Sequence, residues 1–202
     1  MNSAYDKNML QPHPLQGRHV RLEPLARGHH GALCEVGLEE ELWRWTLLRV
    51  HSASDMLEYV EAALGAREEE LEVPFATIDL ASGKVVGSTR FMNIEVKHRR
   101  LEIGSTWIAP AWQRTAINTE AKYLMLRHAF GPLACHRVEF KTDFLNQKSR
   151  DAILRIGAKQ EGIFRNHMII AGGRVRDTVW FSIIDSEWPQ VKLDLERKLS
   201  AG

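Results

Sequence analysis

A short segment between an expected strand and an expected helix carries the residues best suited to binding a phosphate. The strand spans residues 101–108, which include β-branched and aromatic side chains, and Pro110 ends it. The helix is predicted to begin at Thr119 as N-cap and to stop at Gly131. Because the first N–H groups of a helix lack carbonyl partners and the helix dipole adds partial positive charge, the connector 111–118 suits a phosphate.

One cation in this connector, Arg114, can add a charge-assisted contact to the phosphate. The pattern alone is also that of an ordinary strand–helix connection, since every such unit has a loop at this place. The residues by themselves therefore leave both interpretations open.

The connector resembles motif A of the GCN5-related N-acetyltransferase (GNAT) superfamily, Q/R-x-x-G-x-G/A. Here it reads Gln113-Arg114-Thr115-Ala116-Ile117-Asn118, in which Gln113 matches and Ala116 and Asn118 take the positions of small or Gly residues. The continuation 119–121, Thr-Glu-Ala, is common in the branch of ribosomal-protein N-terminal acetyltransferases. In the family this loop holds the pyrophosphate of acyl-coenzyme A through backbone N–H groups. Asn tolerates left-handed geometry better than most residues, and Ala permits close backbone approach.

A second segment, residues 146–157, resembles motif B of the same family, N-x-x-A-x-x-L-Y-x-x-x-G-F. Asn146 and Gly157 match in spacing, and Ser149 takes the small position. Ile153 stands where many relatives place the Tyr that protonates the leaving thiolate, so the resemblance implies the Ser149 hydroxyl as a substitute acid. From the residues alone, Asn146 is equally a helix N-cap and Ser149 an ordinary first-turn residue.

The two motifs together imply acetyl-CoA as the acyl donor and no metal ion. The positions that the resemblance assigns to the donor are Trp107, Ile108, Gln113, Arg114, Thr115, Ala116, Ile117, Asn118, Thr119, Asn146 and Ser149.

Acyl transfer to an amine also needs a group that removes a proton from the amine. Glu102 is the first candidate, because several GNAT enzymes hold a Glu base early on the corresponding strand. His167 is the second, on a strand that lines the acceptor site in this branch, and a neutral His suits this task. The alternatives are an ion-paired carboxylate beside Arg99 and Arg100 and a hydrogen-bonded structural His. Asp177 is expected to form a structural pair.

The resemblance implies direct attack of a primary amine on the thioester within a ternary complex, which proximity accelerates. The acceptor, a protein N-terminus or a small amine, cannot be read from the sequence. One alternative keeps the fold and takes succinyl-CoA, with its extra carboxylate held by Arg90, Arg165 or Arg176. Another is a non-catalytic CoA-binding regulatory module.

Composition bounds the rest. The 202 residues carry a net charge of +1, which does not indicate nucleic-acid or membrane binding. Cys34 and Cys135 form no metal or CxxC pattern, so a reduced, cytoplasmic protein is expected. No apolar run is long enough for a membrane span. Residues 1–14 are predicted to be a flexible arm and residues 15–202 one domain, and a homodimer is expected because paired subunits are common among relatives.

The order of the predicted elements agrees with the family from about Leu15 to Ile184. It predicts an α/β (α+β) fold, with a mixed, mostly antiparallel central sheet splayed between helices on both faces. The expected elements are a strand at 18–22, an irregular helical region at 27–47, a helix capped by Ser52 or Ser54, strands at 73–80 and 85–92, a strand at 136–142, a helix at 146–156, a hairpin of 159–170 with 177–184, and a helix at 186–199.

Overall fold

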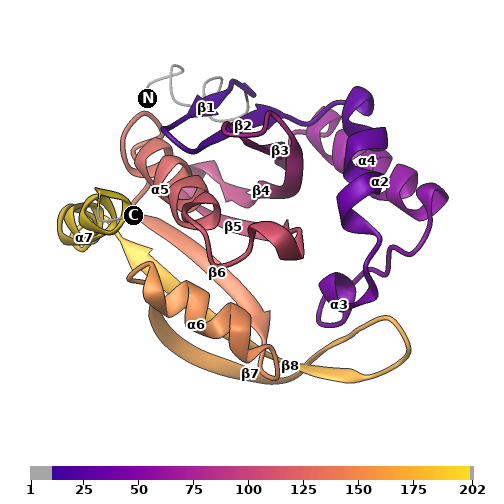
Figure 1. Ribbon diagram of the computed structural model, residues 1–202. Helices are drawn as coiled ribbons and strands as arrows, with labels where there is room; N and C mark the ends of the chain where they lie inside the picture. The colour runs from indigo at the N-terminus through magenta and orange to yellow at the C-terminus, as the bar shows by residue number, and fades with distance from the viewer. Residues whose placement is uncertain (1–10, 201–202) are drawn as a thin grey trace.

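The computed structural model describes residues 11–200 and contains one eight-stranded sheet in the order β1-β2-β3-β4-β5-β6-β8-β7 (Figure 1). Neighbouring strands are antiparallel except β5 and β6, which are parallel. This confirms the predicted mixed, mostly antiparallel sheet. The strands are β1 (Leu15–Gln16), β2 (Val20–Pro24), β3 (Val73–Asp79), β4 (Val85–Glu95), β5 (Arg100–Ile108), β6 (Arg137–Asp143), β7 (Lys159–Ile169) and β8 (Val175–Ile184).

Helices cover both faces of the sheet, and each set closes its own hydrophobic core. The larger core takes side chains from α5, α6 and α7, and the smaller one from α2, α3 and α4. Along β5, Leu101 and Ile103 point into the larger core and Trp107 into the smaller one. The helices are η1 (Arg27–His29), α2 (His30–Gly37), α3 (Glu40–Trp43), α4 (Ala53–Glu68), η2 (Val96–His98), η3 (Pro110–Trp112), α5 (Ala116–Phe130), α6 (Gln147–Arg155) and α7 (Trp188–Ser200).

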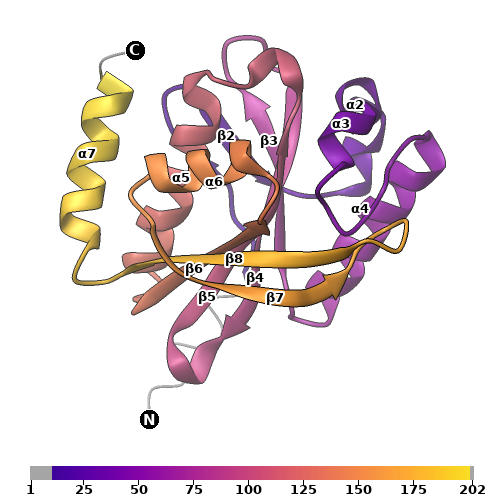
Figure 2. The ribbon, with the colours of Figure 1, turned by 90° about the horizontal axis from the view of Figure 1, so that it is seen from below.

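The sheet is splayed in its middle, between β5 and β6. Only three residue pairs join these strands, and the last is Glu102 with Glu139, although β5 continues to Ile108 and β6 to Asp143. Figure 2 shows the result: β6, β8 and β7 run across the direction of β3 and β4. The edge of β5 beyond Glu102 therefore has backbone groups that β6 does not pair.

A β-bulge lies on β5 just past the point of separation. The register against β4 jumps from Ser88–Trp107 to Arg90–Gly104, so two β5 residues face Thr89 alone. Ser105, one of the two, has a φ of 45°. A bulge re-aims the neighbouring backbone, here beside the open edge of the strand.

Several predicted boundaries are confirmed. Ser52 caps α4, because its hydroxyl accepts the N–H of Asp55 at 3.1 Å and the Asp55 carboxylate accepts the N–H of Ser52 at 3.0 Å. The helix of the second motif ends just before Gly157, whose φ of 96° is one that a β-carbon disfavours. The last hairpin turns through Gly172 and Gly173, as expected.

Other boundaries differ from the sequence prediction. Thr115, not Thr119, is the N-cap of α5, and its hydroxyl accepts the N–H of Ile117 at 3.3 Å. The helical region at 27–47 is broken into η1, α2 and α3. The last strand begins at Val175, before the expected Asp177.

Of the predicted N-terminal arm, residues 1–10 lie outside the described residues, and residues 11–14 are exposed and outside regular secondary structure.

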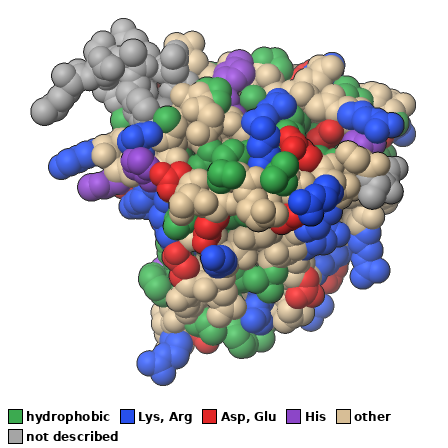
Figure 3. Space-filling model, turned by 90° about the vertical axis from the view of Figure 1, so that its left-hand side faces the viewer, with side chains coloured by type: hydrophobic (Ala, Val, Ile, Leu, Met, Phe, Trp, Pro, Cys, Tyr) green, Lys and Arg blue, Asp and Glu red, His purple; other side chains and the backbone are tan. Residues whose placement is uncertain are grey.

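On the face of the molecule drawn in Figure 3, acidic and basic side chains are interspersed. Within residues 11–200, every helix is too short or too polar to cross a bilayer.

Candidate active site

The loop before α5 has the backbone geometry of an anion site. Arg114 takes a left-handed conformation with a φ of 62°, and α5 begins two residues later. The N–H groups of Ala116 and Asn118 lie in the first turn of the helix, where they lack carbonyl partners within the helix. Because Ala116 and Asn118 are helical residues with negative φ, this chain does not need glycine at either position. The substitutions in motif A are therefore compatible with the loop.

Gln113 joins the loop to both flanking elements. Its Nε2 donates to the carbonyl oxygen of Ile108 at 2.7 Å, and its Oε1 accepts a hydrogen bond from Lys148 of α6. Trp107, by contrast, is buried in the smaller core, where its Nε1 donates to the Tyr59 hydroxyl at 3.3 Å. Only the backbone of Trp107 can face the open edge of β5.

Two further residues of the first motif are polar groups on α5. Asn118 Oδ1 is buried and has no hydrogen-bond partner among the described atoms. A buried acceptor of this kind fits a donor supplied by a ligand. Thr119 is buried, and Arg155 of α6 donates to its hydroxyl at 3.4 Å.

Lys122 of α5 contacts the β-bulge from the face of the sheet that α5 covers. Lys122 Nζ donates to the hydroxyls of Thr106 at 2.5 Å and Thr89 at 3.2 Å, and these two hydroxyls lie 2.8 Å apart. No carboxylate pairs with Lys122 within the described chain, and burial lowers the pKa of its amine to about 7. The amine thus holds together the two strands at the site of the bulge.

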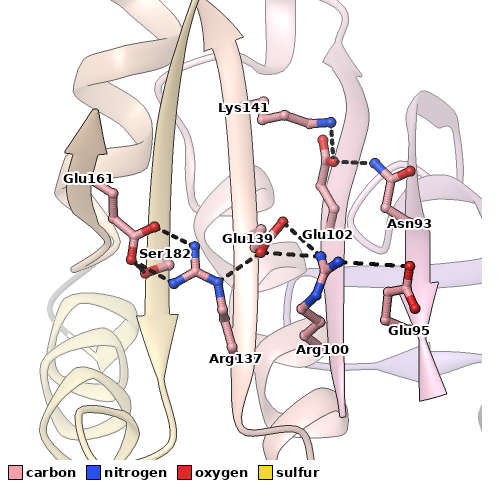
Figure 4. A network of polar contacts seen from close by, with 9 residues as sticks. All are labelled: Asn93, Glu95, Arg100, Glu102, Arg137, Glu139, Lys141, Glu161 and Ser182. Atoms are coloured by element: carbon pink, nitrogen blue, oxygen red, sulfur yellow. Dashed lines mark hydrogen bonds and ion pairs between the residues drawn. The ribbon is translucent and has the colours of Figure 1, made fainter. Parts of the chain in front are cut away.

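Glu102 lies at the point where β5 and β6 part, on the face opposite α5, and its side chain is buried (Figure 4). Asn93 Nδ2 donates to Glu102 Oε2 at 2.6 Å, and Lys141 Nζ lies 2.7 Å from the same oxygen. The expected neighbours Arg99 and Arg100 are not its ion-pair partners. Gly104 leaves room for the carboxylate, since a β-carbon there would lie 2.9 Å from Oε1.

Further charged side chains extend from Glu102 across this face of β4, β5, β6, β8 and β7, which we call the polar face. Figure 4 shows Arg100 between Glu95 and Glu139, at 3.8 and 3.4 Å. Arg137 Nε lies 2.8 Å from Glu139, and the same guanidinium pairs with Glu161 of β7. These charged groups form ion pairs with one another. Glu102 is the carboxylate on this face that lies at the last pair of β5 with β6, next to the open edge of β5.

His167 is on β7 and is exposed, next to a register shift of the β7–β8 pair. Its ring centroid lies 6.2 Å from that of Trp180, and Lys141 Nζ lies 4.6 Å from the centroid of the same Trp180 ring. His167 therefore shares the polar face with Glu102, but Trp180 and Lys141 stand between them. Asp177 accepts the N–H of Asn166 at 2.7 Å, a structural contact with backbone rather than with an Arg.

Asn146 and Ser149 belong to the start of α6, on the other face of the sheet. Asn146 is the N-cap, and its Oδ1 accepts the N–H of Ser149 at 3.1 Å. The Ser149 hydroxyl is half-buried and makes no hydrogen bond to another described side chain. It remains available to a ligand, whereas the side-chain oxygen of Asn146 is committed to capping and only its Nδ2 is left for other contacts.

The end of α3 and the residues that follow it, 43–49, lie beside the start of β8 and the tip of the β7–β8 hairpin. Trp43 is core, and its Nε1 donates to the carbonyl of Gly37 at 2.7 Å. Trp45 is only partly buried, and the guanidinium carbon of Arg174 lies 5.3 Å from its ring centroid. Arg49 donates to the carbonyl of Ala171 at 3.3 Å, so this segment contacts the tip of the β7–β8 hairpin.

Sequence reasoning did not single out Lys141, Lys122 and Arg174, which lie in or beside the candidate site. A single Lys on a strand or helix carries no local signal of burial, and the strand register that sets Lys141 beside Glu102 is not encoded in either strand alone. Among the described residues, no group of three or more His, Cys, Asp or Glu is arranged to hold a metal ion.

A comparison with protein families matches residues 19–159 to the acetyltransferase (GNAT) domain. The chain therefore belongs to the GNAT acetyltransferase family. Among curated proteins, it is 32% identical over 109 residues to the "Putative ribosomal N-acetyltransferase YdaF" of Bacillus subtilis, a match that covers 54% of this chain and 58% of that protein. The match spans little more than half the length of that relative.

Solved structures agree with the fold over most of the chain. A GCN5-related N-acetyltransferase from Brucella melitensis is 35% identical, with a TM-score of 0.87 over 94% of this chain and 86% of its own. Mycobacterium smegmatis RimJ, solved in complex with CoA-disulfide, has a TM-score of 0.77 at 23% identity and covers 95% of this chain and 94% of its own. The latter likeness concerns the fold alone.

Proposed function

We propose that the protein transfers an acetyl group from acetyl-CoA to a primary amine by direct attack. The observation that carries this proposal is the separation of β5 and β6 after Glu102 and Glu139, beside the first turn of α5. This arrangement leaves backbone N–H groups of the helix for a pyrophosphate and an unpaired strand edge for the thioester arm. The buried, unpartnered Asn118 Oδ1 supports the same placement, because the arm of CoA carries amide donors.

The chemistry divides between the two faces of the sheet. The amine nitrogen forms a bond to the thioester carbon, the carbon–sulfur bond breaks, and the proton of the amine goes to a base. We assign Glu102 as that base, directly or through a water molecule, because its Oε1 has no hydrogen-bond partner among the described residues. His167 is the second candidate. The Ser149 hydroxyl on α6 gives a proton to the leaving thiolate and regains one from solvent.

The acceptor is a primary amine, for which we propose a protein N-terminus or a small molecule. We propose that the protein acts in the cytoplasm, because Cys34 and Cys135 are free thiols, as is usual in a reducing compartment. A homodimer stays a prediction. Of the arginines considered for a succinyl donor, Arg90 pairs with Glu72 at 2.7 Å and Arg165 is exposed, so neither is a free, buried cation.

The test has two measurements. Calorimetry with acetyl-CoA should show binding, and a panel of amines should release free thiol from the bound donor. A protein with no affinity at millimolar acetyl-CoA contradicts the proposal. Binding without thiol release from any amine would favour a regulatory CoA-binding module.

A further inference from the structure

Arg176 is a buried cation that has no ion-pair partner within the described residues. Arg176 is 7% exposed, and its Nε donates to the hydroxyl of Thr178 at 3.1 Å. Burying a guanidinium without a carboxylate is unfavourable, because the desolvation free energy is not recovered. An arginine retained in this state is best explained by an anion that arrives with a ligand.

The carboxylates near Arg176 are already engaged by other cations. Asp143 and Glu102 attract its charge, but Asp143 is paired with Arg174 and Glu102 with Lys141. Three cations and two carboxylates thus share this part of the polar face, which leaves one positive charge in excess. The pKa of Arg176 is lowered, chiefly by burial and also by Arg174, as expected for a cation that lacks its own counter-ion.

The position of Arg176 on the sheet points to the substrates. Val179, Phe181 and Ile183 of β8 face the larger core, so Arg176 and Thr178 lie on the opposite, polar face with Glu102. Thr178 pairs with Asp143 at the end of β6, and Arg176 lies beyond that end. Arg174, next to it, packs on Trp45. Arg176 is therefore on the open side of the strand separation, beside the loop that follows α3.

We propose that Arg176, with Arg174 beside it, forms a carboxylate subsite for a substrate of the acyl transfer. The planar guanidinium suits a carboxylate because two N–H groups can donate to its two oxygens. The carboxylate belongs to the acceptor, as in an acidic residue near a peptide N-terminus, or to the acyl group of a dicarboxylic thioester. This inference rests on the proposed transfer reaction, which it narrows to anionic substrates.

The experiment compares matched substrates with wild type and Arg176→Gln. One arm uses acetyl-CoA with peptide pairs that differ only by Glu against Gln, or Asp against Asn, at the second or third position. The other arm uses succinyl-CoA against acetyl-CoA with a neutral amine. We expect wild type to prefer the acidic substrate of one arm and Arg176→Gln to raise the KM for it ~10- to 100-fold, with kcat and the neutral substrate little changed.

Two controls separate recognition from folding. Arg197→Gln removes an exposed arginine of α7, away from the polar face, and should change neither KM. Arg176→Lys should restore only part of the preference because it keeps the charge without the planar fork. The melting temperature of Arg176→Gln should not fall, since the variant removes an unpaired buried charge. Equal loss with acidic and neutral substrates, or no preference in either arm, overturns the subsite. If no amine releases thiol and no acyl-CoA binds, the transfer proposal itself fails.

Discussion

Lys141 Nζ lies 2.7 Å from Glu102 Oε2, and Asn93 Nδ2 donates to that same oxygen at 2.6 Å. Both donors converge on one side of the carboxylate, so its other oxygen, Oε1, faces away from them. These two contacts fix the orientation of the carboxylate at the point where the sheet opens. The first two predictions concern this pair.

Replacing Glu102 by Gln should lower kcat by about 10²- to 10⁴-fold, the usual contribution of a general base, without weakening acetyl-CoA binding. The measurement is steady-state thiol release across pH, together with calorimetry of the donor. His167→Gln is the matched comparison on the same face and should change kcat less than threefold, roughly, because Trp180 and Lys141 separate it from Glu102. The reverse order of effects would make His167 the base.

Replacing Lys141 by Met should destabilise the fold by about 3 kcal/mol, since it leaves a buried carboxylate without its cation. Adding Glu102→Gln to this variant should recover much of the loss. A double-mutant cycle from chemical denaturation measures the coupling. Additive effects of the two substitutions would show that the ion pair contributes nothing to stability.

Arg114 tests the anion site before α5. Asn at this position accepts the left-handed backbone but removes the charge, so Arg114→Asn should weaken CoA binding by roughly tenfold and reduce its salt dependence. Arg114→Lys should retain most of the affinity. The control is Arg165→Asn, which removes an exposed arginine of β7, and this variant should bind CoA as wild type does. Equal affinity of all four proteins would exclude a role of the Arg114 charge.

Lys122 makes stability depend on pH in the alkaline range. The pKa of its amine is about 7 in the folded protein and 10.5 in the unfolded chain, so burying it costs most below pH 7, and this cost disappears as pH rises to 10.5. Relative to Lys122→Met, wild type should therefore gain about 3 kcal/mol of unfolding free energy between pH 6 and 9.5. Denaturant titrations of both proteins at the two pH values measure this difference. A constant difference would mean that the amine has an ordinary pKa.

His128 makes the stability of the fold depend on pH in the acidic range. Burial, with His13 and Arg127 nearby, lowers its pKa from 6.5 to about 4, so the neutral ring is the form that the fold accepts. The stability that this provides is complete above pH 6.5 and is lost as pH falls toward 4, by about 2 kcal/mol. His128→Gln should lack that component, whereas His98→Gln, at an exposed position, should keep it. Thermal melts from pH 7 to 4 make the comparison.

The elements with strong local patterns could be predicted from the sequence. Ser52 starts a helix with its own capping partner, and Gly157 ends one by adopting a left-handed conformation, so both are local decisions. Residues 101–108 include the apolar side chains Leu101, Ile103 and Trp107, which the two cores bury, and this composition predicted a strand.

The start of the central helix could not be predicted in this way, because Thr115 and Thr119 are equally good caps. Glu120, the residue after Thr119, accepts backbone N–H groups of residues 18–20 at 2.6–2.8 Å, a contact across about a hundred positions of the chain. For the same reason, the partner of Glu102 is Lys141 from the next strand rather than an adjacent Arg. Local propensity cannot indicate such tertiary contacts.

The three-pair junction of β5 and β6 has a consequence for the kinetics of substrate entry. Because the strands already diverge beyond Glu102, admitting a ligand between them breaks no ladder hydrogen bond. We therefore expect substrate association to need no opening step in the sheet, with its rate set by diffusion and by the side chains at the entrance.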